Sequence, residues 1–167
     1  ALELAPRSVL DVGTGSGAIA LAITDELPEC EVTATDTSAA ALEVARANAE
    51  RLGLADRVRF LEGSVPEGEE FDLVVANLPY VAAADWDSLA PEVTQWEPRE
   101  ALLAGPDGLD AIRATIPVLA NAASVVALEV GEGQAEAVGR MLREAGFSAA
   151  ETRQDLAGIE RVAVARR

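Results

Sequence analysis

Apolar residues along the chain follow two alternating patterns. Short, nearly continuous apolar runs are typical of buried strands, and they predict seven strands at 8–12, 31–35, 57–61, 71–76, 124–130, 147–153 and 161–165. Between these runs, apolar positions recur at helical spacing and predict helices over about 17–27, 38–52, 110–121 and 133–145. Strands that alternate with helices indicate a parallel sheet covered by helices, so we expect an α/β fold.

The last two predicted strands break this alternation. Only residues 154–160 separate them, and a connection of that length cannot hold a crossover helix. The two strands must therefore be antiparallel if they pair directly. The expected architecture is five parallel strands followed by an antiparallel terminal hairpin, in one domain that spans residues 1–167.

The periodic pattern is lost between about residues 77 and 106. Pro, Trp, Asp and Gly are frequent there, and neither a helical nor a strand period is sustained. Long irregular stretches inside compact domains are usually functional, so we expect this segment to face a substrate. Its two tryptophans, Trp86 and Trp96, either wall a substrate channel or cover the core.

The composition excludes several kinds of catalytic and binding site. All 13 basic residues are Arg, and His is absent, which excludes a histidine base, a lysine Schiff base and the lysine of a phosphate-binding loop. Against 29 acidic residues the net charge is −16, so extended contact with nucleic acid is not expected. With Cys30 as the single cysteine, we expect no metal site and a reducing, cytoplasmic location. The longest uncharged run, 114–128, is too short to span a bilayer, so no membrane contact is expected.

Three glycines follow the first predicted strand, and an acidic residue ends the second. Gly13, Gly15 and Gly17 permit positive φ and a close approach of a ligand to the backbone. Asp36 lies at the spacing where a carboxylate accepts hydrogen bonds from both ribose hydroxyls. Together they imply a ligand that contains adenosine, and a tight strand-to-helix connection is the simpler alternative. The G-x-G-x-G spacing disfavours a pyrophosphate site slightly but leaves NAD open.

The fourth predicted strand delivers a polar tetrapeptide to the edge where ligands bind in open α/β sheets. Asn77 offers an amide oxygen, and Pro79 biases Leu78 toward an extended backbone, so the Leu78 carbonyl can point outward beside it. These two acceptors can hold the two N–H groups of a planar amide or amino group, and the Tyr80 ring can pack against that group. The alternative is an Asn-Pro turn with Tyr80 in the core.

The glycine turn and the terminal hairpin resemble the seven-stranded, Rossmann-like fold of S-adenosylmethionine (SAM) methyltransferases. Asn77-Leu78-Pro79-Tyr80 is similar to the Asn-Pro-Pro-Tyr motif of the methyltransferases that act on planar nitrogen. The resemblance implies SAM as cofactor and places the catalytic contacts at residues 77–80. It implies cofactor contacts at Asp11, Gly13, Thr14, Gly15, Gly17, Asp36, Thr37, Ser64, Val65 and Asn77. Asp11 would orient either the glycine turn or the methionine ammonium of SAM.

Further along the chain the match narrows to one family. The protein N5-glutamine methyltransferases of the HemK type are similar to this chain over nearly its whole length, at Glu97-Pro98, Ala101-Leu102, Gly105, Asp107-Gly108-Leu109, Glu129, Gly131, Gln134, Asp155-Leu156-Ala157-Gly158 and Arg161. This resemblance implies methylation of the glutamine in the Gly-Gly-Gln loop of a peptide-chain release factor. A sister group methylates a glutamine of a ribosomal protein.

The chain departs from the family pattern in three places. The family carries an amino-terminal helical domain that helps to bind the substrate. This chain starts almost at the first strand, so we expect this domain to be absent from it, either because the chain is a fragment or because it is a shortened relative. Gly63-Ser64 stands where the family commonly has an acidic residue near the adenine amino group, and a Ser64 hydroxyl accepts a weaker hydrogen bond than a carboxylate. Leu78 replaces the first Pro of the family motif.

The resulting hypothesis is a SAM-dependent transfer of a methyl group to the amide nitrogen of a protein glutamine. One alternative is an amino-group methyltransferase for adenine or guanine in nucleic acid, which uses the same acceptor geometry but is disfavoured by the net charge of −16. A second is a non-catalytic nucleotide-binding module that uses only the glycine turn and Asp36. A third is an NAD-dependent oxidoreductase.

Overall fold

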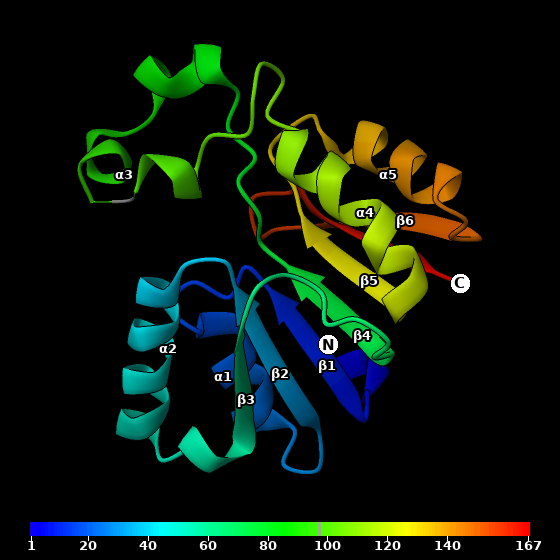
Figure 1. The fold of residues 1–167 in the computed structure, drawn as a ribbon. Coiled ribbons are helices and arrows are strands. Elements are labelled where there is room, and N and C mark those ends of the chain that lie inside the picture. The colour runs from blue at the N-terminus through cyan, green and yellow to red at the C-terminus, as the bar shows by residue number, and fades with distance from the viewer. Residues whose placement is uncertain (97) are drawn as a thin grey trace.

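A computed structural model describes residues 1–96 and 98–167 and contains one seven-stranded sheet (Figure 1). The strands are β1 (Ser8–Val12), β2 (Glu31–Asp36), β3 (Val58–Glu62), β4 (Phe71–Ala76), β5 (Ala123–Glu129), β6 (Ala149–Gln154) and β7 (Glu160–Arg166). The α-helices are α1 (Ala18–Glu26), α2 (Ala39–Leu52), α3 (Pro91–Trp96), α4 (Asp110–Ala122) and α5 (Ala135–Glu144). Short 3₁₀ turns are η1 (Leu2–Leu4), η2 (Ala55–Arg57), η3 (Ala83–Ser88) and η4 (Arg99–Ala101).

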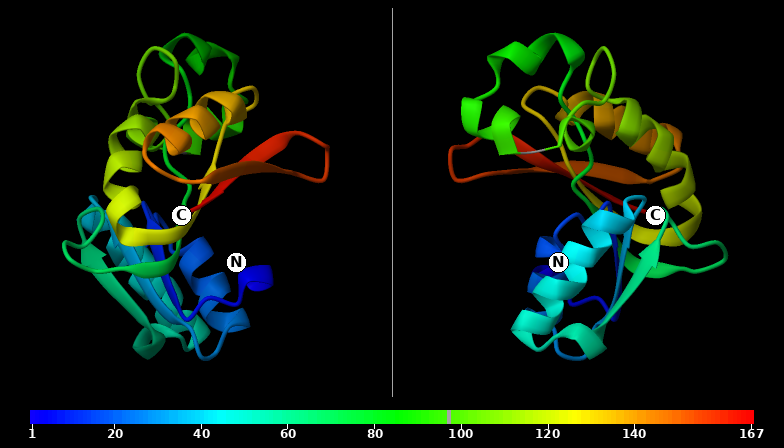
Figure 2. Two further views of the ribbon diagram at one scale, coloured as in Figure 1. Left: turned by 90° about the vertical axis from the view of Figure 1, so that its right-hand side faces the viewer. Right: turned by 60° about the vertical axis from the view of Figure 1, so that its left-hand side comes forward.

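The strand order is β3-β2-β1-β4-β5-β7-β6. The pairs from β3 to β5 are all parallel, whereas β7 runs antiparallel to both β5 and β6. The prediction of five parallel strands and an antiparallel terminal hairpin is therefore confirmed. The hairpin extends away from the rest of the sheet at its β6–β7 turn (Figure 2).

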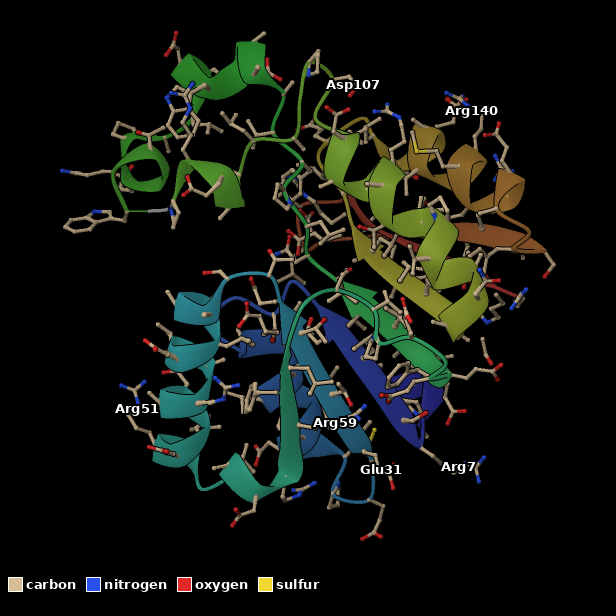
Figure 3. All side chains as sticks on the ribbon, in the orientation of Figure 1. Arg7, Glu31, Arg51, Arg59, Asp107 and Arg140 are labelled. Carbon is tan, nitrogen blue, oxygen red and sulfur yellow. The ribbon has the colours of Figure 1, made fainter. Side chains whose placement is uncertain are left out.

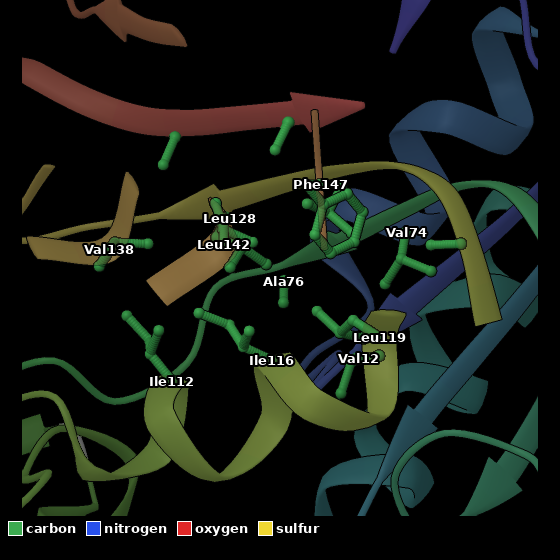
Figure 4. Close-up of a cluster of buried hydrophobic side chains, with 14 of the residues drawn as sticks. Val12, Val74, Ala76, Ile112, Ile116, Leu119, Leu128, Val138, Leu142 and Phe147 are labelled. Atoms are coloured by element: carbon green, nitrogen blue, oxygen red, sulfur yellow. The ribbon is translucent and has the colours of Figure 1, made fainter. Parts of the chain in front are cut away.

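The two faces of the sheet are covered by different helices (Figure 2). One core cluster packs Val9 and Val75 against α1 and α2, and the other packs Leu10 and Val74 against α4 and α5. Consecutive strand residues thus point to opposite cores, which explains why these strands read as continuous apolar runs. In the second cluster Ile112, Ile116 and Leu119 of α4 face the sheet (Figure 4).

Local chemistry accounts for the helix ends. The Ser38 hydroxyl accepts a hydrogen bond from the Ala41 N–H and caps α2, while Gly53 closes the same helix in the left-handed conformation. Helix α4 continues through Pro117, as predicted. Within the described residues no helix has the length and apolarity needed to cross a membrane.

The irregular segment predicted between residues 77 and 106 contains short helical pieces. A parallel bridge between Val81 and Leu103 closes its base, and η3, α3 and η4 lie beyond that bridge. Trp86 is half-buried, with the Arg99 guanidinium 4.8 Å from the centre of its ring. Trp96 is 78% exposed, so of the two alternatives for this residue the one in which it covers the core is not met. Glu97, one of the residues that carried the family resemblance, lies outside the described residues.

Candidate active site

The residues singled out in the sequence meet at one edge of the sheet. Strands β1, β2, β3, β4 and β5 are parallel, so their carboxyl ends, from Val12 to Glu129, reach the same side of the molecule (Figure 1). The glycine turn follows β1, Asp36 ends β2, residues 63–65 follow β3, and the tetrapeptide 77–80 follows β4. This is the edge where open α/β sheets bind ligands.

The glycine turn is a compact unit. The N–H groups of Gly13 and Thr14 both donate to the Thr35 carbonyl, at 2.8 and 2.9 Å. At Gly17, with φ +82°, a Cβ would lie 3.2 Å from the Ala45 Cβ, so a side chain there would be strained by the positive φ and crowded by α2. At Gly15, with φ +57°, a Cβ would meet no heavy atom within 4 Å. The turn is therefore closed on its helix side and open over Gly15, where a ligand can approach the backbone.

The Asp11 carboxylate stabilises this turn by hydrogen bonds. Its Oδ2 accepts hydrogen bonds from the Thr14 hydroxyl at 2.7 Å and from the Ala20 N–H at 3.1 Å. Burial raises the pKa of Asp11 from 3.8 to about 6, although these two hydrogen bonds act in the opposite direction. Oδ1 is buried and has no hydrogen-bond partner among the described residues. A buried carboxylate oxygen without a donor is a site that a ligand cation can satisfy.

Asp36 ties the end of β2 to the glycine turn. Its Oδ2 accepts a hydrogen bond from the Gly15 N–H at 2.9 Å, and its Oδ1 accepts one from the Ser38 N–H at 2.8 Å. Each carboxylate oxygen can accept more than one hydrogen bond, and the side chain is only half-buried. The carboxylate can therefore hold the turn and still accept from a ligand.

The remaining predicted cofactor contacts differ in exposure. The Gly63 N–H donates to the Asp36 carbonyl at 2.9 Å, which brings the segment after β3 beside the end of β2. Thr37 and Ser64 are exposed, and Val65 is half-buried against the core under α4 and α5. The Thr37 and Ser64 hydroxyls thus face solvent at this edge.

The tetrapeptide after β4 touches the glycine turn. Ala76 pairs with both Val12 of β1 and Leu128 of β5, so the next residue, Asn77, leaves the sheet between them. The Leu78 Cδ2 lies 3.1 Å from the position that a Cβ on Gly13 would occupy. Asn77 is exposed. A side-chain amide is therefore accessible at the place where the two loops meet.

Tyr80 is held against the end of β5. Its hydroxyl donates to Glu129 Oε1 at 3.2 Å, and its Cδ2 lies 3.2 Å from the position of a Cβ on Gly131. Burial and the nearby Glu129 charge raise the pKa of the Tyr80 hydroxyl. The ring is half-buried and belongs to neither core cluster, so the alternative of a core tyrosine is not met.

Sequence reasoning did not assign a role to Glu129 or Gln134, although both stood among the residues that carried the family resemblance. Gln134 precedes α5, and its side chain contacts the loop after β4. Neither spacing nor periodicity could identify these contacts, because each joins residues about fifty positions apart.

A groove of about 540 Å³ lies at the opposite edge of the sheet, at the amino ends of the strands. Ser8, Glu31, Arg59 and Phe71 are among the residues that line it. Figure 3 shows Glu31 and Arg59 at this edge, far from Asp107. This groove contains none of the predicted site residues, so it is a separate feature from the candidate active site.

Comparison with known proteins identifies relatives of the whole chain. A sequence model for the methyltransferase domain matches residues 9–96. The release factor glutamine methyltransferase of Geobacter sulfurreducens is 44% identical over 97% of this chain and 59% of its own length. That of Xylella fastidiosa strain Temecula1 is 47% identical over 96% of this chain and 60% of its own length. The chain thus spans about six tenths of the length of these curated relatives.

Solved structures share the fold at low sequence identity. A crystal structure of a putative O-methyltransferase from Nostoc punctiforme has a TM-score of 0.70 at 20% identity, covering 99% of this chain and 53% of that protein. A methyltransferase from Pyrococcus furiosus has a TM-score of 0.70 at 18% identity, covering 95% of this chain and 74% of that protein. These structures show the shared fold, and the match of the methyltransferase-domain model to residues 9–96, more than half of the chain, shows that the chain belongs to that family.

Proposed function

We propose that residues 1–167 form the SAM-dependent catalytic domain of a protein-glutamine methyltransferase, which transfers a methyl group to the side-chain amide nitrogen of a glutamine. The observation that carries this proposal is the contact between the tetrapeptide 77–80 and the glycine turn. Leu78 lies against Gly13, and the exposed Asn77 stands beside that contact. An amide acceptor site and an adenosine site would therefore share one edge of the sheet.

The residues at this edge fit SAM. The open backbone at Gly15 has room for the methionine part, and the half-buried Asp36 carboxylate can accept from ribose hydroxyls. The unpartnered Asp11 Oδ1 would favour the ammonium group, directly or through water. Gly13, Thr14 and Gly17 shape this turn, and Thr37, Ser64 and Val65 would border the adenosine. When bound, SAM supplies a methyl group on a sulfonium, which is electrophilic and needs no further activation.

The acceptor side works by alignment. An amide nitrogen is a poor nucleophile because its lone pair is delocalised into the carbonyl. The Asn77 side-chain oxygen and the Leu78 carbonyl would accept the two N–H groups, raise the electron density on nitrogen and fix the direction of its face. Pro79 restricts the backbone between them and Tyr80, whose ring would border the planar amide. Positioning of this kind can lower a barrier by roughly 7 to 11 kcal/mol. As the N–CH3 bond forms, the bond between the methyl group and sulfur breaks, SAM leaves as its neutral thioether, and the nitrogen loses one proton to solvent.

The proposed substrate is a peptide-chain release factor. Two relatives at 44% and 47% identity carry the name release factor glutamine methyltransferase. Release factors act in the cytoplasm, and we place the reaction there. A methyltransferase for adenine or guanine amino groups would use the same acceptors, but 29 acidic against 13 basic residues oppose a phosphate backbone.

Two measurements on the wild-type chain test this function. Calorimetry should show SAM binding, with weaker or no binding of NAD. Tritiated methyl from SAM should be incorporated into a release factor, and replacing its Gly-Gly-Gln glutamine by alanine should remove the label. Transfer to RNA or DNA instead would favour a methyltransferase for amino groups of adenine or guanine. SAM binding without any transfer would favour a non-catalytic module, and preferential NAD binding an oxidoreductase.

A further inference from the structure

Gln134 lies outside the tetrapeptide but is bound to its last residue. We propose that Gln134 is a positioning residue that fixes the Tyr80 carbonyl and thereby sets the direction of the Asn77 and Leu78 acceptors. This inference rests on the proposed function and deepens it, because it names the part of the chain that orients the acceptor loop. Gln134 acts through Tyr80 and touches no reacting atom in this scheme.

The Gln134 amide joins three segments of the chain. Its Nε2 lies 2.9 Å from the Tyr80 carbonyl oxygen, 3.3 Å from that of Asp107 and 3.5 Å from that of Gly108. Its Oε1 accepts a hydrogen bond from the Gly131 N–H at 2.9 Å. Both ends of the amide are thus used, and the loop after β5 is linked to the loop after β4 and to the turn before α4.

Two glycines make room for this amide. A Cβ on Gly108 would lie 2.3 Å from the Tyr80 carbonyl oxygen and 2.8 Å from Gln134 Nε2. A Cβ on Gly131 would lie 2.9 Å from Gln134 Oε1. A side chain at position 108 would therefore require the backbone at Tyr80 to move, and a side chain at position 131 would displace the Gln134 amide. Gln134 is half-buried, and both ends of its amide lie against backbone that has no side chain.

The tetrapeptide is anchored at both of its ends. At the start, Ala76 is paired with Val12 and Leu128 in the sheet. At the other end, Gln134 holds the Tyr80 carbonyl, and Glu129 accepts from the Tyr80 hydroxyl. Only residues 77–79 lie between these anchors, and the ring of Pro79 fixes the φ angle of that residue. The direction of the two acceptors therefore depends on where Gln134 holds Tyr80.

The expected effect is on turnover and not on SAM affinity. None of the Gln134 hydrogen bonds reaches the glycine turn or Asp36. A displacement of about 1 Å in a positioning group can cost roughly 100-fold in rate. We therefore expect Gln134→Met, which keeps the length but loses the amide, to lower kcat by about 10- to 100-fold. The dissociation constant of SAM should stay within about twofold.

Gln134→Glu gives a second and reversible perturbation. A carboxylate keeps the acceptor for the Gly131 N–H but turns an oxygen toward the Tyr80 carbonyl, which is repulsive. On protonation the same group becomes an O–H donor to that carbonyl. The kcat of this variant, relative to wild type at each pH, should therefore rise as the pH falls. Gln154→Met is the matched control, because Gln154 is exposed at the end of β6.

One readout does not depend on activity. Tyr80 is the single tyrosine of the chain, so a tyrosine with an isotopically labelled carbonyl carbon gives one NMR resonance, which reports the acceptor of the Gln134 hydrogen bond. Gln134→Met should shift this resonance, Gln134→Glu should return it toward the wild-type position on acidification, and Gln154→Met should leave it in place.

The two proposals fail in different ways. If the wild-type chain binds SAM but methylates no release factor, the proposed function fails. The Tyr80 resonance still tests whether Gln134 is hydrogen-bonded to the Tyr80 carbonyl. An unchanged resonance in Gln134→Met overturns the hydrogen bond between Gln134 and the Tyr80 carbonyl. An unchanged kcat, or equal losses of SAM affinity and kcat, overturns the positioning role. If Gln134→Met does not fold, the pH dependence of the resonance and of kcat in Gln134→Glu decides the question.

Discussion

The glycine turn after β1 and the tetrapeptide after β4 lie in contact at one edge of the sheet but are held in different ways. The side-chain hydrogen bonds of the turn join residues 3, 9, 21 and 32 positions apart, through Asp11, Asp36 and Asn48. Those of the tetrapeptide join residues 49 and 54 positions apart, through Glu129 and Gln134. The glycine turn is stabilised by residues close to it in the sequence, whereas the tetrapeptide is stabilised by residues from the second half of the chain.

This difference separates the two tasks of the proposed enzyme. The side-chain partners of the turn come from β1, β2, α1 and α2, which all lie in the first third of the chain. The acceptor loop takes its shape only when β5 and the start of α5 have docked. Changes near Gln134 should therefore affect transfer without affecting SAM binding, whereas changes at Asp11 or Asp36 should act on the turn.

The largest effect is expected at Asn77. Asn77→Ala removes one of the two proposed acceptors while leaving the Leu78 contact with Gly13 in place. We expect a hundred- to thousandfold loss in kcat, the size seen when one aligned polar group is removed from a transition state. SAM affinity, measured by calorimetry, should remain nearly intact. Asn121→Ala, at an exposed asparagine in α4, is the control, and normal turnover by Asn77→Ala would refute the acceptor role.

The next effect is a pH dependence of stability from Asp11. Its pKa is raised to about 6 in the folded protein and is ordinarily 3.8, so the folded state holds the proton more tightly than the unfolded state does. Stability from this group is present below about pH 4 and is lost as the pH rises through 6, by about 3 kcal/mol in all.

Asp11→Asn cannot ionise and should remove this dependence. The unfolding free energy of the variant, minus that of wild type, should therefore increase between pH 4 and pH 7 in denaturant titrations. Glu62→Gln, at an exposed carboxylate that ends β3, corrects for the change in net charge. A difference that stays constant with pH, once this control is subtracted, would contradict the assignment.

A smaller effect is expected at Asp36. Asp36→Ala leaves the Gly15 and Ser38 N–H groups without their carboxylate and removes the proposed ribose contact. Hydrogen bonds to charged groups are worth about 1.5 to 3 kcal/mol, so SAM should bind roughly ten- to a hundredfold more weakly. At saturating SAM the kcat should recover, because the acceptor loop is unaffected. Unaltered SAM binding would contradict the proposed ribose contact and would leave Asp36 with a structural role in the turn.

The sequence was sufficient for most of the fold. Apolar runs located all seven strands to within about two residues, and the runs are clearest in β1, β2 and β4 because these strands are buried on both faces. The seven residues after 153 were enough to make the terminal pair antiparallel. Ser38 and Gly53 located the ends of α2 because capping is a local effect.

The candidate site was predictable only where its chemistry is local. The spacing of Gly13, Gly15 and Gly17 with Asp36 placed the turn, since these residues contact one another across short loops. The role of Gln134 had no local signal, because it depends on how α5 docks beside the loop after β4. The exposure of Trp96 was also missed, since a large apolar side chain ordinarily indicates burial.

The smallest effect is expected at Leu78, where the two loops touch. Leu78→Ala keeps the backbone carbonyl that serves as the second acceptor but removes the side chain that lies over Gly13. Because Leu78 is only half-buried, we expect a loss of stability of about 1 to 2 kcal/mol, which is below the usual range for truncation of a fully buried leucine. The kcat and the SAM affinity should each fall by only a few-fold, because both loops keep their own anchors. Leu52→Ala, at a leucine that is 63% exposed, is the control. A loss at Leu78 as large as that at Asn77 would mean that the contact itself orients the acceptors, and the separation between a locally built turn and a remotely held loop would then be wrong.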